Sequence, residues 1–327
     1  MPSLGVVGTL VWDRIHRPRE REMPVEEWGG IAYGLAALAA SLPEDWTVRP
    51  ILKVGRDRAE DAFRFLGRIP RLEDSGVVVV PERNNFVELH YRDEGRRTEI
   101  LHGGVPGWSW PELAPQVELC DALYLNFISG FEMSLETAQA LRRGYDGPLY
   151  ADLHSLFLGI TGSGERVPRE LVGWAEWLRC FDAVQMNEDE FELLGAHAGD
   201  PWHLAAEALG PDLKLLAVTL GERGAAYVAG AEFRPDPGSW RAVSRLRSTA
   251  PARSGRVPVE GALRTGDPTG CGDVWGATFF AGLLAGQGLE ASMRDANRLA
   301  SRNVEHRGAR GLHRFLAGRL PLLEDHP

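Results

Sequence analysis

The feature that most restricts the fold of this sequence is its alternation of short, β-branched apolar runs with helical patterns. Strands are predicted at Leu4–Val11, Thr47–Val54, Ala122–Phe127, Leu149–Asp152, Ala183–Met186, Leu215–Leu220 and Ala225–Ala229. Helices are predicted at Ile31–Ser41, Arg58–Leu66, Ser134–Arg143, Pro168–Arg179, Glu188–Leu194 and Trp202–Leu209. Strands separated by such helices are typical of a mostly parallel sheet with helices on both faces. The sequence therefore predicts a three-layer α/β sandwich.

One stretch departs from this alternation. Gly76–Pro81, Asn85–Tyr91 and Arg97–Leu101 have the pattern of short strands joined by turn residues, which predicts an inserted antiparallel β meander at about residues 76–101. An insertion too small for its own core usually lies over a site or a partner subunit. We find no internal repeat and no interdomain linker, so residues 1–327 are expected to form one domain.

Composition limits the partners and the compartment. The 46 acidic and 36 basic side chains give a net charge of −10, which disfavours a nucleic-acid or anionic-membrane surface. The three cysteines show no metal-ligand spacing and indicate a reduced compartment without structural zinc. No signal-peptide pattern is found, and the longest apolar run, Ile31–Leu42, is too short to span a bilayer. We expect a cytoplasmic protein with neither nucleic-acid nor membrane partners.

The strongest chemical signal is the segment Asp267–Asp273, which reads Asp-Pro-Thr-Gly-Cys-Gly-Asp. It lies between a predicted strand, Val257–Arg264, and a predicted helix, Val274–Ala285; the preceding residues 241–257 are expected to form a mobile loop. A strand, small residues and a helix place backbone N–H groups at the positive end of the helix dipole, which favours an anion. Gly270 and Gly272 allow close approach of a phosphate.

Asp273 is unusual at an anion site because its carboxylate repels a phosphate. It suits the site if it accepts a proton from an attacking hydroxyl, as a general base does. The alternative is an acid at a helix start that only interacts with the dipole, worth a few tenths to about 1 kcal/mol. The local pattern leaves both interpretations open.

The same segment, followed by Val274-Trp-Gly-Ala277, resembles the second signature of the ribokinase (PfkB) carbohydrate kinase family. The resemblance implies a ribokinase-like sandwich with a β lid and ATP- and Mg²⁺-dependent transfer of the γ-phosphate to an alcohol group of a sugar or sugar-like molecule. It implies that Asp273 is the catalytic base and that the backbone of Gly270, Cys271 and Gly272 forms the anion hole. Cys271 departs from the family, in which a small Ala or Gly is usual.

Other segments match the family in its order along the chain. Asn187-Glu-Asp-Glu190 matches an Asn-x-x-Glu motif, which implies that Glu190 helps to place Mg²⁺ and that Asn187 lies on the nucleotide side. The segment that contains Thr219, Gly221 and Gly224 resembles the nucleotide-side loop, and Asn297 corresponds to a contact near the adenine. Taken locally, these are an acidic helix start and a hairpin turn, which are common features without function.

The N-terminal part resembles the substrate side of the family. Asp13 corresponds to an aspartate that binds substrate hydroxyls, and Gly29 and Gly30 resemble the paired glycines that border the sugar. Gly55 and Asp57 match a segment whose role is structural. The meander at 76–101 corresponds to the family's lid, which can mediate a homodimer. Need for a monovalent cation stays open.

Other classes of enzyme lack their motifs in this sequence. Gly5-Val-Val-Gly8 lacks the third glycine of a dinucleotide fold, and no GxxxxGK[ST], GxSxG or HExxH pattern is present. A catalytically silent, ligand-binding member of the fold stays open, although Glu190 and Asp273 are both retained. A nucleoside kinase is a second alternative, because ribosides present the same hydroxyls as a sugar. The sequence does not identify the acceptor.

Overall fold

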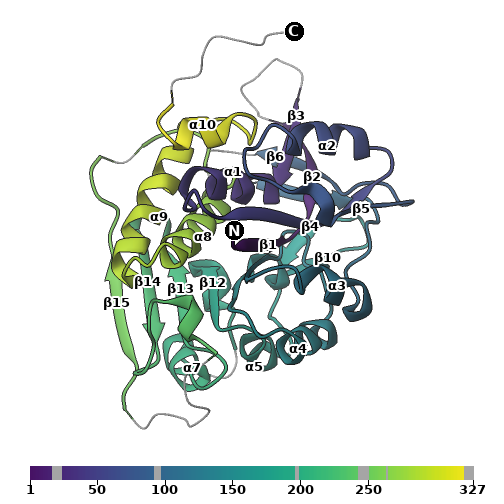
Figure 1. The fold of residues 1–327 in the computed structure, drawn as a ribbon. Helices are drawn as coiled ribbons and strands as arrows, with labels where there is room; N and C mark the ends of the chain where they lie inside the picture. Colours follow the sequence, from purple (N-terminus) through teal and green to yellow (C-terminus); the bar gives the residue numbers. More distant parts are fainter. Residues whose placement is uncertain (17–23, 92–96, 196–198, 242–249, 263, 320–327) are drawn as a thin grey trace.

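The structure is a computed structural model that describes residues 1–16, 24–91, 97–195, 199–241, 250–262 and 264–319. A central sheet has the strand order β15-β14-β13-β12-β9-β8-β1-β4-β5 (Figure 1). Its strands are β1 (Ser3–Val7), β4 (Thr47–Gly55), β5 (Val77–Val80), β8 (Ala122–Asn126), β9 (Leu149–Asp152), β12 (Ala183–Asn187), β13 (Leu215–Thr219), β14 (Ala225–Ala229) and β15 (Arg253–Val257). Neighbours from β13 to β5 are parallel, whereas β14 and β15 pair antiparallel. The predicted mostly parallel sheet is confirmed.

Helices cover both faces of this sheet (Figure 1). One face packs against α1 (Ile31–Ser41), α2 (Ala59–Leu66), α8 (Cys271–Leu284), α9 (Leu289–Asn303) and α10 (Leu312–Leu316). The other packs against α3 (Trp110–Val117), α4 (Leu135–Gly144), α5 (Trp174–Arg179) and α7 (Pro201–Ala208). Alternating strand residues feed the two cores: Val6 points into the first and Val7 into the second. The three-layer α/β sandwich is therefore confirmed.

A second, four-stranded sheet has the order β3-β2-β6-β7, and we call it the lid because it contains most of the predicted lid segment. Its strands are β2 (Leu10–His16), β3 (Val25–Gly30), β6 (Phe86–Tyr91) and β7 (Arg97–His102). All neighbours are antiparallel except β2 and β6, which are parallel. The lid is thus continuous with the main body through the short link from β1 to β2.

The predicted bounds of the lid, 76–101, need correction. They include β6 and β7, but β5 pairs in parallel with β4 and belongs to the central sheet. The other two lid strands come from the N-terminal part, because the predicted strand Leu4–Val11 is interrupted at Gly8–Thr9, where the chain passes from one sheet to the other. Which sheet a strand joins depends on partners far away in the sequence, and the local residue pattern carries no information about these partners.

Three further predictions in the C-terminal part need correction. The strand predicted at Val257–Arg264 instead ends at Val257, because Pro258 has no N–H with which to continue the ladder. The helix α8 begins at Cys271 rather than Val274. The predicted mobile loop is partly β15, and its residues 242–249 lie outside the described ones.

A short hairpin also replaces the start of a predicted helix. Strands β10 (Leu158–Ile160) and β11 (Arg166–Pro168) precede α5, so the helix predicted from Pro168 begins only at Trp174. The remaining helix, α6 (Glu188–Glu192), follows β12 directly. The β10–β11 hairpin contacts the lid strand β7, where Leu101 N donates to Gly164 O.

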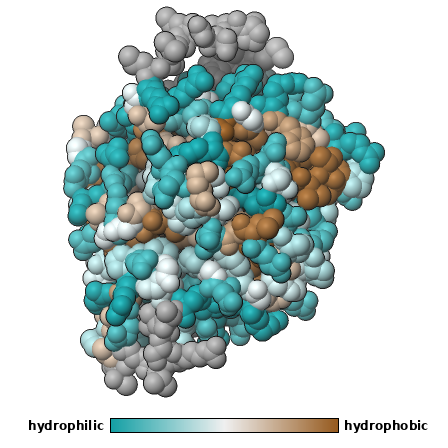
Figure 2. All heavy atoms as spheres, in the orientation of Figure 1, coloured by the Kyte–Doolittle hydropathy of each residue, from teal (hydrophilic) through white to brown (hydrophobic). Residues whose placement is uncertain are grey.

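The surface is predominantly hydrophilic on the face in Figure 2, with apolar residues in separate patches. Val78 and Val79 of the edge strand β5 are among the exposed apolar side chains. Within the described ranges, none of the helices combines the length and apolar character that crossing a membrane requires.

Candidate active site

Polar side chains end several neighbouring strands of the central sheet. Asn126 ends β8, Asp152 ends β9, Asn187 ends β12 and Thr219 ends β13. Because these strands are parallel, their carboxyl ends meet at one edge, where ligands bind in open α/β sheets. Asp152, Asn187 and Thr219 line a cavity of about 1850 Å³ at this edge. The volume is large enough for two ligands side by side.

The first turn of α8 faces this cavity. Gly270 precedes the helix with φ +76°, a conformation that favours glycine, and a Cβ there would lie 2.3 Å from the Tyr33 ring. At Gly272 a Cβ would meet no atom within 4 Å, so this glycine faces open space. The first N–H groups of a helix have no partner within the helix. The geometry therefore matches the anion site that the sequence predicts, and the pKa of the Cys271 thiol, raised to about 11 by burial, keeps that residue neutral.

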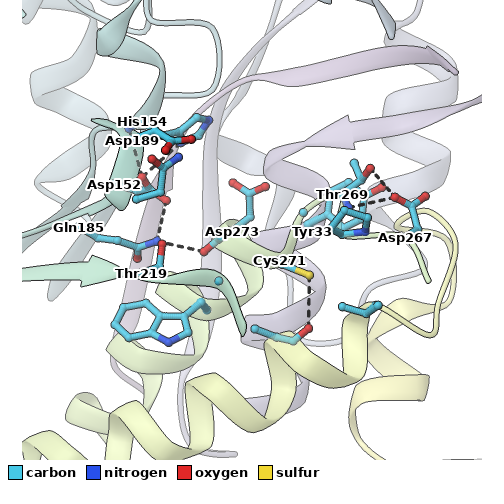
Figure 3. A pocket seen from close by; sticks show the side chains of 18 of the residues that line it. Tyr33, Asp152, His154, Gln185, Asp189, Thr219, Asp267, Thr269, Cys271 and Asp273 are labelled. Atoms are coloured by element: carbon cyan, nitrogen blue, oxygen red, sulfur yellow. Dashed lines mark hydrogen bonds and ion pairs between the residues drawn. The ribbon is translucent and has the colours of Figure 1, made fainter. Parts of the chain in front are cut away.

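Asp273 lies on this first turn, between two groups of polar side chains (Figure 3). Asp152 and His154 are on one side, and Tyr33, Thr269 and Asp267 are on the other. Asn126 donates to Oδ1 of Asp273 at 2.7 Å and to the Tyr124 hydroxyl at 3.1 Å.

Three short hydrogen bonds also close the loop before the helix. Thr269 donates to Oδ1 of Asp267 from its backbone N (3.0 Å) and from its hydroxyl (2.6 Å), and Cys271 N donates to Pro268 O at 3.1 Å. The loop that precedes Asp273 is thus held by its own side chains, which fixes the direction of the helix start.

Gln185 joins α8 to the strand ends. The side chain is buried on β12, donates to Oδ2 of Asp152 and to the Gly272 carbonyl, both at 3.1 Å, and accepts from the Tyr150 hydroxyl at 2.6 Å. The helix approaches so closely that a Cβ on Gly276 would lie 2.3 Å from Gln185 Oε1. Gln185 therefore fixes the anion site relative to Asp152.

Glu190 and Asn187 form a capping box at the start of α6. Asn187 donates to the Glu190 carboxylate from its backbone N (2.8 Å) and from Nδ2 (2.6 Å). Its side-chain Oδ1 accepts from Glu190 N (2.9 Å). Burial and, to a lesser degree, the Asp152 carboxylate raise the pKa of Glu190 to about 7, although the His154 charge opposes them. A nearby cation would stabilise the charged form of this carboxyl group.

His154 stands next to Asp152. Its Nδ1 lies 3.2 Å from Asp152 Oδ1, which also accepts from the His154 backbone N at 3.2 Å. Burial lowers the pKa of His154, but Asp152, Asp273 and Glu190 raise it more, and the pKa reaches about 9. These carboxylates therefore favour the protonated form of the imidazole.

The donor atoms at this point fit a hard divalent cation. Asp152, His154 and Asp273 each place one ligand atom within 4.8 Å of the others. Carboxylate oxygens suit Mg²⁺, which keeps several of its waters, whereas a protonated imidazole cannot bind a metal. Several carboxylates here would also repel a phosphate unless a cation lay between them. Asp152 and Asp273 are the carboxylates of this group, and Glu190, the metal residue predicted from the sequence, is not part of it.

The nucleotide-side residues predicted from the sequence line the same cavity. Thr219 ends β13, and Gly221 and Gly224 follow it. Gly224 (φ +93°) approaches β15 so closely that a Cβ would lie 2.1 Å from Val257 O. Asn297 on α9 lines the cavity as well, but its side chain accepts from Trp275 Nε1 at 2.8 Å and donates to Val257 O at 3.0 Å. Asn297 thus holds the end of β15, at Val257, beside the cavity.

The predicted substrate residues lie at the other end, on the lid strands β2 and β3. Asp13 is buried on β2, and its carboxylate lies against Gly29, where a Cβ would be 1.7 Å from Asp13 Oδ2. Gly30 has φ +60° and begins α1. Asp13 and Gly30 line the cavity, whereas Gly29 is not among the lining residues and stands behind Asp13.

The structure thus brings the predicted residues from both halves of the chain to one cavity, except Gly29. Sequence reasoning missed Asn126, Asp152, His154, Gln185 and Tyr33. Three of them end or lie near the end of a predicted strand: Asn126, Asp152 and Gln185. A polar residue at the carboxyl end of a predicted parallel strand was the signal that could have found them.

Residues 168–313 match the model of the pfkB family carbohydrate kinases. No curated protein sequence matches the chain.

Solved structures share the fold over nearly the whole chain. Adenosine kinase from Sinorhizobium meliloti has a TM-score of 0.71 at 20% identity and covers 97% of each chain. A ribokinase from Arabidopsis thaliana, complexed with ribose and ATP, has a TM-score of 0.68 at 18% identity and covers 98% of this chain and 99% of its own. A nucleoside kinase from Burkholderia thailandensis, complexed with inosine, has a TM-score of 0.68 at 16% identity and covers 95% of this chain and 93% of its own. The fold is ribokinase-like.

Proposed function

From the confirmed resemblance to the PfkB carbohydrate kinases and the ribokinase-like fold, we propose that this chain transfers the γ-phosphoryl group of ATP to a hydroxyl of a sugar or nucleoside. The observation that carries the proposal is the position of Asp273. Its carboxylate is on the first turn of α8, in the cavity that also contains the strand-end residues and Asp13. A base and an anion site in one turn suit phosphoryl transfer to an alcohol.

The reaction follows from these positions. ATP lies along the loop after β13 and the helix α9, with its phosphates at the N-terminus of α8. The acceptor lies between Asp13 and Asp273. Asp273 takes the proton of the acceptor hydroxyl as the hydroxyl oxygen bonds to the γ-phosphorus. The bond between the γ-phosphorus and the β–γ bridging oxygen breaks, and ADP leaves.

Stabilisation of the transferred group comes from fixed donors. We expect the backbone N–H groups of Gly270 and Gly272 to face the equatorial oxygens, whereas the Cys271 N–H is bonded to Pro268 O, and a protonated His154 would add a positive charge nearby. Asp152 would hold Mg²⁺, with Glu190 acting through one of the waters of the ion, and the ion would neutralise phosphate charge. Most of the rate enhancement would come from positioning and electrostatics.

The proposal is tested by ADP release from MgATP with a panel of pentoses, hexoses, sugar phosphates and ribonucleosides as acceptors. Turnover that depends on an added acceptor, with one phosphate found on that acceptor, is the expected result. ATP binding without turnover on any acceptor favours the ligand-binding alternative. Absence of both binding and turnover contradicts the proposal.

A further inference from the structure

The acceptor end of the cavity is long and changes in character along its length. The inward face of the lid contributes Asp13 from β2, Val87 and Leu89 from β6, and Glu99 from β7. In the strand register Asp13 lies beside Val87, and Leu89 lies beside Glu99. A carboxylate, an aliphatic stretch and a second carboxylate therefore follow one another across three strands.

The register also sets the length of this face. Neighbouring strands lie about 4.8 Å apart and residues rise about 3.3 Å along a strand, so Asp13 and Glu99 are separated by roughly 12 Å. Asp13 and Glu99 line one continuous cavity. A single pentose bound at Asp13 would leave the aliphatic stretch beyond it without a ligand.

The body of the molecule contributes further aliphatic and polar residues to this cavity. Ile128 and Leu158 are aliphatic, and the Arg166 side chain is only 6% exposed. Arg166 donates from Nη1 to Ile128 O (3.1 Å) and from Nη2 to Ser129 O (3.3 Å). Its guanidinium also lies 3.8 Å from Glu99 Oε2, so the polar end of the slot combines an acceptor and a donor.

The β10–β11 hairpin keeps this polar end in place. Besides the Arg166–Glu99 ion pair, Leu101 N donates to Gly164 O at 2.9 Å, and Ile100 bridges to Glu165. The lid strand β7 is therefore attached to the body next to Glu99, and the end of the slot is formed before an acceptor arrives.

We infer that the acceptor is a ribonucleoside, with its base between the aliphatic walls formed by Val87, Leu89, Ile128 and Leu158, and with Glu99 and Arg166 as the specificity-determining pair. This inference rests on the proposed function. A flat heterocycle fills an aliphatic slot, and its edge carries both donors and acceptors, which match Arg166 and Glu99. The ribose then occupies the space at Asp13, with a hydroxyl directed toward Asp273.

The inference is tested on the full chain with MgATP by comparing kcat/KM for adenosine, inosine, cytidine and uridine with kcat/KM for ribose and a set of hexoses. We expect at least one nucleoside to exceed every free sugar by about 100-fold, since a site that hydrogen-bonds a ligand edge strongly rejects ligands without it. A free sugar used as well as any nucleoside overturns the inference and leaves the kinase standing. No turnover with any acceptor contradicts the kinase itself.

Two variants test the assigned residues. Glu99→Gln keeps the size of the side chain and should raise KM for the nucleoside about tenfold while KM for ATP is unchanged. Val87→Thr keeps the shape of valine and should also raise the nucleoside KM, because a hydroxyl then faces the base. The exposed Glu118→Gln is the control. Unchanged nucleoside KM in both variants overturns the assignment of the slot.

Discussion

Glu190 lies among charged groups that oppose one another. Asp152 and burial favour its neutral form, while His154 favours its charged form, and the resulting pKa of about 7 lies in the physiological range. Ordinary carboxyl groups lose their proton well below this pH. The charge on Glu190 is therefore sensitive both to pH and to a bound cation.

This environment predicts a pH-dependent effect of Glu190→Gln on stability. In the wild type the folded state keeps the Glu190 proton up to about pH 7, whereas the unfolded state releases it near pH 4.5, so the contribution of Glu190 to stability falls as pH rises through this window. Gln has no such proton. The unfolding free energy of the variant minus that of the wild type should rise by on the order of 1 kcal/mol from pH 5 to pH 8.

Urea unfolding without divalent cations measures this difference. Gln can keep the capping box with Asn187, so the start of α6 should be equally stable in the variant and in the wild type. Glu192→Gln, an exposed residue of the same helix, is the matched control. A difference that is equal at both pH values would contradict the assigned environment. In turnover assays the same Glu190→Gln variant should need more Mg²⁺.

At the scale of elements, one side chain connects the lid to the body. Asn84 is buried between the end of β4 and the start of β2: its Oδ1 accepts from Gly55 N, and its Nδ2 donates to Leu10 O, both at 3.0 Å. Asp57 Oδ1 accepts from Asn84 N at 2.8 Å. The Gly55–Asp57 segment, expected to have a structural role, thus positions this connection.

Asn84→Ala should therefore act on the lid. It leaves the Gly55 N–H and the Leu10 carbonyl without these bonds, which should lower the unfolding free energy by about 1–3 kcal/mol. KM for the acceptor should rise, since Asp13 is on the strand that Asn84 holds, while KM for ATP stays near the wild-type value. Glu82→Ala, exposed in the same turn, is the control. An equal rise in both KM values would argue against a lid-specific role.

At the scale of the whole molecule, the cavity lies at the carboxyl ends of the central strands, and a buried ion cluster lies at their amino ends. Asp182 precedes β12 at the edge opposite the cavity and is fully buried. Its carboxylate contacts Arg142 at 2.8 Å, Arg241 at 3.2 Å and Lys214 at 3.3 Å, and accepts from Leu149 N at 2.9 Å. This cluster holds the starts of three strands together.

Asp182→Ala should reduce stability without changing chemistry. It leaves buried cations without their anion, which costs about 3–5 kcal/mol of unfolding free energy. kcat and the ATP affinity should stay within about twofold at a temperature where the variant is folded, because the cavity is at the other edge. Asp212→Ala removes a half-exposed partner of the same Arg142 and should cost less than about 1 kcal/mol. Equal losses in the two variants would contradict the burial argument.

The sequence was sufficient where the signal is local. The parallel sheet follows from alternating apolar runs, and the anion site follows from glycines that precede a helix. It was insufficient where distant segments decide: β5 pairs with β4, β2 and β3 complete the lid, and Asn126 meets Asp273 across 147 positions. The strand-end residues Asp152 and Gln185 became visible only when the strand order placed them beside α8.

The central claim, that Asp273 is the general base at an anion site, is tested most directly by Asp273→Asn. Asparagine can still accept from Asn126, so the fold and the ATP site should persist. We predict that kcat with the best acceptor falls by roughly 10²–10⁴-fold while the ATP dissociation constant changes less than about threefold. The exposed Asp45→Asn should behave as the wild type. Near-wild-type turnover in Asp273→Asn would contradict the account.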